Sequence, residues 1–211
     1  MLVFNENNFR TLCDEVCNKD GDLKNIIIKY GYPPMWTRPC TFQTLIHFIL
    51  EQQVSLASAK AALIKLKEKT GSITPLKLLA LSDEEMKSCY FSRQKLIYAR
   101  HLAEAIVSKK LALKKLAALP DEDVRKELTS IKGIGNWTAD VYLLFALHRT
   151  DVFPTGDLAM MNAFKEIKQL EKNISKDELL RVTEPWKPYR SIATMMLWHY
   201  YIKRKNIKIA E

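Results

Sequence analysis

Two glycines separated by one apolar residue form the most informative short motif. Gly133-Ile134-Gly135 follows a segment typical of a helix and precedes the apolar run Val141–Leu147, which predicts a second helix. A turn this tight leaves backbone N–H groups uncovered beside the positive N-terminal end of the next helix, and such a site can hold a phosphate. A lone G-x-G also occurs in ordinary helical corners. Our candidate phosphate-binding residues are Lys132, Gly133, Gly135 and Thr138, in a contact independent of base sequence.

One acidic residue follows a Pro/Gly loop twenty residues after Trp137. The loop contains Pro154 and Gly156, and Asp157 comes directly after it, where a helix is predicted to begin. An Asp in this position is usually an N-cap. The positive end of the helix also favours an ionised carboxylate, which is able to stabilise a developing positive charge or act as a general base. The two roles are compatible.

The elements that must position these residues are predicted to be helices. Ser82 with Glu85 and Ser175 with Glu178 form two capping boxes, and Pro120 marks a third helix start. We expect about ten helices joined by short loops and no long strand. The proline-rich stretch 30–39 cannot be helical, and it separates an acidic N-terminal helix pair from the rest of the chain.

Composition limits the classes of protein to which the chain can belong. Its 211 residues are 47% hydrophobic and 27% charged, which suits one compact domain or two small lobes. The net charge of +9 lies entirely after the acidic first 22 residues, and this favours a polyanionic partner such as nucleic acid. Apolar runs are far shorter than the about 20 residues that a membrane-spanning helix needs, and the first residues do not resemble a secretory leader.

The cysteines do not form a recognisable metal or cluster motif. The four residues are Cys13, Cys17, Cys40 and Cys89. No second Cys or His pair completes a zinc pattern, and the absence of Cys after Cys89 excludes a C-terminal four-cysteine iron–sulfur loop. We therefore expect reduced thiols and no iron–sulfur cluster.

Four segments, in order, carry a resemblance to a known family. Residues 131–140 resemble the hairpin of the helix–hairpin–helix DNA glycosylase superfamily, and Asp151–Leu158 resembles its Gly/Pro-rich loop with the essential aspartate. Phe42–Ser55 and Pro185–Trp198 resemble the alkylbase branch, of the DNA-3-methyladenine glycosylase II type. The resemblance covers roughly residues 33–200. It implies that Asp157 is the catalytic residue.

The resemblance also implies an activity and a base pocket. The expected reaction is hydrolysis of the N-glycosidic bond of alkylated purines, such as 3-methyladenine and 7-methylguanine, after the nucleotide rotates out of the duplex. Gln53, supported by Gln52, would plug the vacated space, and the pocket residues would be Trp137, Trp198 and Tyr189. Bifunctional relatives carry Lys where this chain has Trp137, so no lyase step is expected. Val141 stands where the best-known bacterial enzyme has an aromatic residue.

The implied fold is all-α with two lobes and a cleft between them. Residues 1–40 with 151–211 would form the terminal lobe, and residues 41–150 the central lobe that contains the hairpin at the mouth of the cleft. Lys132, Lys187 and Arg190 would hold the DNA. A monovalent cation bound by the backbone carbonyls of Thr129, Ile131 and Ile134 is the one cofactor that the resemblance suggests.

Two other functions stay open on the sequence alone. One is a glycosylase of the same fold for another base, such as uracil, mismatched thymine or oxidised guanine. The other is a non-catalytic DNA-binding protein that keeps the hairpin, against which Asp157 argues by its spacing. The expected partner is double-stranded DNA with alkylated bases, bound by a monomer. The expected location is the cytoplasmic nucleoid of a prokaryote or the nucleus of a eukaryote, with no membrane association.

Overall fold

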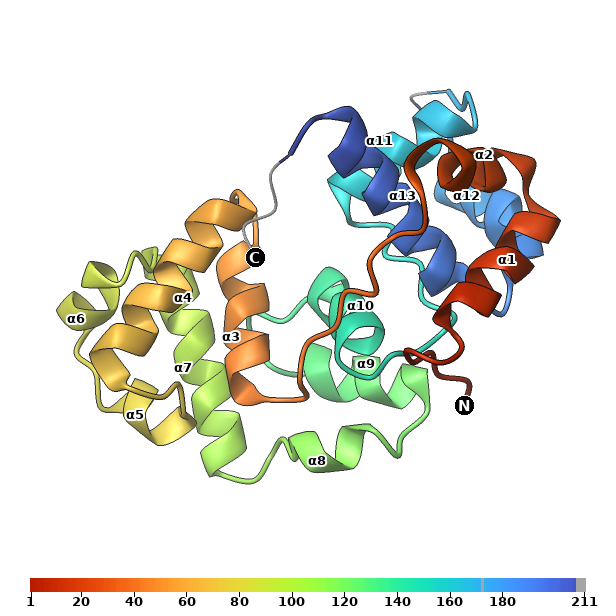
Figure 1. The fold of residues 1–211 in the computed structure, drawn as a ribbon. Helices are drawn as coiled ribbons and strands as arrows, with labels where there is room; N and C mark the ends of the chain where they lie inside the picture. The colour runs from red at the N-terminus through yellow and green to blue at the C-terminus, as the bar shows by residue number, and fades with distance from the viewer. Residues whose placement is uncertain (172, 208–211) are drawn as a thin grey trace. The chain divides into compact units, whose positions relative to one another are not determined.

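A computed structural model describes residues 1–171 and 173–207, and helices joined by loops make up this part of the chain (Figure 1). It contains thirteen α-helices and one 3-10 helix, more than expected because α5, α6 and α8 are only 5, 6 and 4 residues long. The described residues form no strand, only an isolated bridge between Val3 and Arg149. The all-α prediction is confirmed.

The helices follow one another along the chain with short connections. They are α1 (Phe9–Lys19), α2 (Gly21–Tyr30), α3 (Phe42–Glu51), α4 (Leu56–Thr70), α5 (Pro75–Leu79), α6 (Asp83–Ser88), α7 (Arg93–Val107), α8 (Leu113–Leu116), α9 (Asp121–Thr129), α10 (Asn136–Phe145), α11 (Leu158–Ile167), α12 (Lys176–Thr183), η1 (Glu184–Trp186) and α13 (Arg190–Arg204). Residues 31–41 connect α2 to α3, so the stretch 30–39 is non-helical as predicted except for Tyr30, which ends α2.

Local side-chain bonds set several of the helix starts. Both predicted capping boxes are present, at Ser82 before α6 and at Ser175 before α12. Helix α9 begins directly after Pro120, as predicted. Thr41 caps α3 by accepting the Thr44 N–H at 3.2 Å. These bonds satisfy N–H groups that have no partner within the first helical turn.

The chain divides into two compact units. One comprises the described residues of Met1–Thr37 and Leu143–Lys208, and the other comprises Arg38–Tyr142. The boundaries predicted from the sequence were 40 and 151. The second boundary lies earlier, inside α10, because the end of this helix packs in the first unit, where Phe145 stacks on Trp198 with ring centroids 5.2 Å apart.

The unit formed by the two chain ends is built around α13. Helices α1, α2 and α11 all pack against α13, which joins segments from opposite ends of the sequence (Figure 1). Its aromatic core contains Phe153, Phe164 and Trp186, with centroid separations of 5.3–6.0 Å. The Trp186 indole also donates to Asp20, the N-cap of α2, at 2.6 Å. This bond ties the acidic N-terminal helix pair to η1.

The unit formed by residues 38–142 is built around α3 and α7. Helix α3 packs against α4 and α7, and α5 and α6 also pack on α7. The buried face of α3 is nearly continuous: Leu45, Ile46, Phe48 and Ile49 are all fully buried. This burial fixes the direction in which α3 ends, at the Gln52-Gln53 turn.

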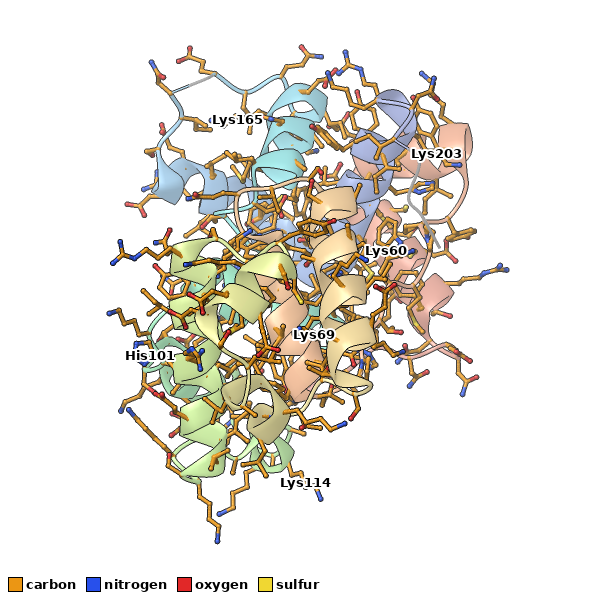
Figure 2. All side chains as sticks on the ribbon, turned by 90° about the vertical axis from the view of Figure 1, so that its left-hand side faces the viewer. Lys60, Lys69, His101, Lys114, Lys165 and Lys203 are labelled. Carbon is orange, nitrogen blue, oxygen red and sulfur yellow. The ribbon has the colours of Figure 1, made fainter. Side chains whose placement is uncertain are left out.

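The surface of the described residues carries many basic side chains. Lys114 points away from α8, and His101 lies on the outer side of α7 (Figure 2). No helix in the described part of the chain is long and apolar enough to cross a membrane.

Candidate functional site

The Asp157 carboxylate is held in place by two donors. Asp157 is the N-cap of α11, and its Oδ1 accepts the Met160 N–H at 2.8 Å and the Trp198 indole N–H at 3.0 Å. The loop before it is anchored because Phe153 and Pro154 are buried. The side chain of Asp157 itself is half-buried. The carboxylate therefore has a fixed orientation and stays partly accessible, at the positive end of a helix.

Trp198 has a contact that the sequence did not predict. Trp198 is 9% exposed, and one face of its ring stacks on Phe145, with an interplanar angle of 14°. Its N–H is bound to Asp157. The sequence proposed Trp198 as a wall of the base pocket. In the structure it lies in position to orient the carboxylate, and one face of its ring is covered by Phe145.

Of the two basic residues predicted near α13, Arg190 differs from expectation. Arg190, predicted to hold DNA, makes a bidentate ion pair with Asp151 through Nε at 2.6 Å and NH2 at 2.9 Å. It is 18% exposed, so its charge serves to hold the Gly/Pro loop. Lys187 lies 2.9 Å from Glu184, and the amine of Lys19 lies over the Tyr189 ring at 5.3 Å. The half-buried Tyr189 thus already carries a cation on one face.

The hairpin between α9 and α10 is a tight turn anchored by two buried side chains. Ile131 and Ile134 are each 4% exposed, and the Ile134 N–H donates to the Ile131 carbonyl at 3.0 Å. Gly133 has φ of +97°, which L side chains rarely adopt. A Cβ at Gly133 would lie 2.1 Å from Cγ of Tyr98, whereas one at Gly135 would meet nothing within 4 Å. Only glycine fits at position 133, because the Tyr98 ring lies against it. At position 135 the absence of a side chain leaves the backbone open to a ligand.

In the first turn of α10, the candidate phosphate ligands are backbone amides and not the Thr138 side chain. Thr138 is 1% exposed, and its hydroxyl accepts a bond from Gln52 at 3.1 Å. This corrects its assignment as a phosphate ligand as far as the side chain is concerned, because a buried and bonded hydroxyl does not reach DNA. Lys132 is exposed, and Asp140 pairs with Arg125 at 2.8 Å.

The two glutamines after α3 have different environments. Gln53 is exposed and has φ of +58°, so the turn presents its side chain to solvent. Gln52 is half-buried, and its Nε2 donates to the Gly133 carbonyl at 2.9 Å as well as to Thr138. Gln53 remains the candidate plug. Its neighbour Gln52 is bonded to the hairpin through its amide, so it stands behind Gln53 as a supporting residue and is not itself exposed.

The remaining pocket residues belong to the unit of residues 38–142. Trp137 is half-buried at the second position of α10. Val141 is 1% exposed and lies in the core, so burial accounts for an apolar residue at this position. The candidate residues thus fall into two groups. Asp157, Trp198 and Tyr189 lie in one unit, and the hairpin, Gln53 and Trp137 lie in the other.

The hairpin carbonyls are the candidate ligands for a monovalent cation. Thr129 ends α9, so its carbonyl belongs to the last turn, where helices leave carbonyls without helical partners. The Ile131 carbonyl already accepts one hydrogen bond, from Ile134, and keeps a second lone pair. The chemistry of these oxygens fits a hard cation, and the site stays a prediction. Among the described residues no group of three or more His, Cys, Asp or Glu is arranged to hold a metal, and none of the four cysteines forms a disulfide.

Sequence reasoning missed three contributors to the site. Phe145 stacks on Trp198, and the Tyr98 ring lies against Gly133. Lys95 donates to the Leu50 carbonyl at the end of α3 at 2.6 Å. Phe145 lies within an apolar run, and the sequence predicts only that the residues of this run are buried. Tyr98 and Lys95 lie on one face of α7, three residues apart, which was the one available signal.

Comparison with known proteins adds independent evidence. The family model of the HhH-GPD superfamily base excision DNA repair proteins matches residues 46–188, more than half of the chain. DNA-3-methyladenine glycosylase 1 of Schizosaccharomyces pombe is 32% identical over 161 residues, 74% of this chain and 71% of the relative. A Bacillus subtilis relative is 35% identical over 124 residues, 59% of this chain, and the chain spans only 43% of that relative's length.

A solved structure agrees with these matches. The Schizosaccharomyces pombe 3-methyladenine DNA glycosylase in complex with abasic DNA has a TM-score of 0.83 and 27% identity, covering 95% of this chain and 100% of that one. The hairpin, the capped aspartate and the extent of the family match lead to one conclusion: the chain belongs to the HhH-GPD superfamily of base excision DNA repair proteins.

Proposed function

We propose that this protein is a monofunctional DNA glycosylase that hydrolyses the N-glycosidic bond of alkylated purines in double-stranded DNA. The observation that carries the proposal is the Asp157 carboxylate, fixed by the Met160 amide and the Trp198 indole at the start of α11. A fixed, partly accessible carboxylate is the one catalytic group that this reaction requires. The names of the similar glycosylases from Schizosaccharomyces pombe support the choice of lesion.

The chemistry needs little acid catalysis. A purine alkylated at N3 or N7 carries a positive charge and leaves as a neutral base, so the bond to the sugar is already labile. The remaining task is to stabilise the oxocarbenium-like sugar and to guide water to it. A preorganised negative group performs the first, and its removal commonly costs about 10²–10³-fold in rate. The same carboxylate is able to accept a proton from the water.

Binding to DNA would use groups that do not read bases. The hairpin offers open backbone at Gly135 and a cation at Lys132, both suited to phosphate. Gln53, exposed on its turn, is suited to fill the space that a rotated nucleotide leaves. We further propose that the protein acts as a monomer on duplex DNA in the nucleoid or nucleus, and that a cation at Thr129, Ile131 and Ile134 stabilises the hairpin.

Trp137 supports both the lesion choice and the absence of strand cleavage. Its half-exposed indole offers a π-face to a cationic base, a contact worth roughly 0.5–2 kcal/mol. It also occupies the position at which lyases carry an amine, so the product is an intact strand with an abasic site.

The test is base release by Asp157→Asn from a methylated duplex. We expect the single-turnover rate to fall at least about 100-fold, while affinity for an abasic duplex stays within about twofold. Asp177→Asn, at the exposed first turn of α12, is the matched control and should change neither. Release of uracil or 8-oxoguanine in place of methylated purine would indicate another specificity on the same fold. Binding without release of any base would indicate a non-catalytic DNA-binding protein.

A further inference from the structure

The Gln52 side chain connects two elements that recognise different parts of the DNA. Its Nε2 donates to the Gly133 carbonyl in the hairpin at 2.9 Å and to the Thr138 hydroxyl in the first turn of α10 at 3.1 Å. An amide NH2 carries two donors, and both are used here. Thr138 is 1% exposed, so this contact is shielded from water. One side chain at the end of α3 thus bonds to both the hairpin and the first turn of α10.

The two residues before Gln52 are also anchored from outside α3. The Leu50 carbonyl accepts the Lys95 amine at 2.6 Å, and the Glu51 carboxylate accepts both ends of the Arg38 guanidinium at 2.6 and 2.9 Å. The Glu51 side chain is only 7% exposed. Carbonyls in the last helical turn lack partners within the helix, so Lys95 satisfies one of them. The last turn of α3 is therefore rigidly held on three consecutive residues.

Gln53, the next residue, has no such anchoring of its side chain among the described residues. It is exposed, and its φ of +58° lies in the left-handed region that non-glycine residues adopt only where their surroundings hold them. The surroundings here are the anchored residues just before it. Gln53 therefore extends to solvent directly from a segment that is anchored on the residues before it.

We propose that Gln52 is a positioning residue that couples the phosphate-binding hairpin to the plug residue Gln53. This inference rests on the proposed function and deepens it. When the hairpin sits on the DNA backbone, the Gly133 and Thr138 contacts of Gln52 set where the Gln53 turn stands on the same duplex. Sequence-independent binding then places the plug in advance, which lowers the entropy cost of inserting it. Without this bond, binding of the hairpin to the DNA backbone would no longer position Gln53 for insertion into the duplex.

The experiment compares Gln52→Met, Gln53→Ala and the double variant. Met keeps the length of the side chain and removes both donors. Gln43→Met, on the half-buried start of the same helix α3, is the matched control. Three quantities are measured for each: affinity for undamaged duplex, the fluorescence rise of 2-aminopurine placed beside an abasic site, and single-turnover release of methylated base. Thermal melting is recorded beside them.

Coupling predicts a specific pattern. Gln52→Met should lower the fluorescence rise and the base-release rate by about 3–10-fold, the scale of one or two net hydrogen bonds. Affinity for undamaged duplex should stay within about twofold. Adding Gln53→Ala should cause less than about twofold further loss, because a plug that is no longer positioned has little left to lose. Gln43→Met should resemble the parent.

Several results would overturn the proposal. Losses that multiply in the double variant would mean that the two residues act independently. Equal losses of undamaged binding and of base release would mean that Gln52 only supports the hairpin. If Gln52→Met fails to fold, Thr138→Val, which removes one acceptor, should show the same pattern at smaller size. Because the fluorescence readout involves no chemistry, it tests the coupling even if the parent releases no methylated base, which would instead refute the proposed function.

Discussion

The bond between Trp198 and Asp157 leads to a specific prediction for Trp198→Phe. The substitution removes the indole N–H that lies 3.0 Å from Oδ1 and keeps an aromatic ring to stack on Phe145. A hydrogen bond to a charged group is worth about 1.5–3 kcal/mol, and about 1.4 kcal/mol is tenfold in rate. The Met160 amide still holds the same oxygen at 2.8 Å, and water reaches the half-buried carboxylate. We therefore expect the lower end, a rate loss of about tenfold.

The assay is single-turnover release of 7-methylguanine from duplex DNA, with DNA affinity and thermal melting measured in parallel. Trp186→Phe is the matched control, because it breaks a similar indole–carboxylate bond, to Asp20 at 2.6 Å in the same unit. It should lower the melting temperature and leave the rate per folded molecule unchanged. In an Asp157→Asn background, Trp198→Phe should cause no further loss of rate.

Two results would refute this reasoning. An unchanged rate in folded Trp198→Phe would mean that the Met160 amide alone orients Asp157. An equal slowing by Trp186→Phe would mean that the loss reflects general loosening of the unit and has no link to the carboxylate.

The remaining predictions concern the hairpin and Trp137. Gly133→Ala should lower the free energy of unfolding by about 2–4 kcal/mol, because its Cβ would collide with Tyr98 at positive φ, whereas Gly135→Ala should barely change melting and should weaken DNA binding. Lys132→Ala should reduce the slope of log affinity against log salt by about 0.9, measured by anisotropy titration, and an unchanged slope would exclude a phosphate contact. Borohydride should trap no enzyme–DNA adduct, and a trapped adduct would contradict the absence of a lyase step. Trp137→Ala should slow excision of cationic purines more than of hypoxanthine, and an unchanged ratio of these two rates would contradict a cation–π contact.

The local features of the fold could be predicted from the sequence. The capping boxes at Ser82 and Ser175 and the N-cap Asp157 are present as predicted. Each joins a side chain to a backbone N–H three residues away, so nothing beyond the neighbouring residues decides it. The hairpin is a mixed case: the positive φ of Gly133 belongs to the turn itself, whereas the collision of a Cβ there with Tyr98 comes from tertiary packing.

The sequence by itself determined the helical class, the hairpin, the capped acid and the family to which these belong. Only the tertiary structure decided which partners the candidate residues have. Trp198 and Asp157 are 41 residues apart in sequence, Gln52 and Gly133 are 81 apart, and Arg190 and Asp151 are 39 apart. Each of these side chains has many possible partners at such separations, and residue type does not distinguish among them. The choice is made when buried helix faces pack, because packing alone brings one donor and one acceptor within hydrogen-bonding distance.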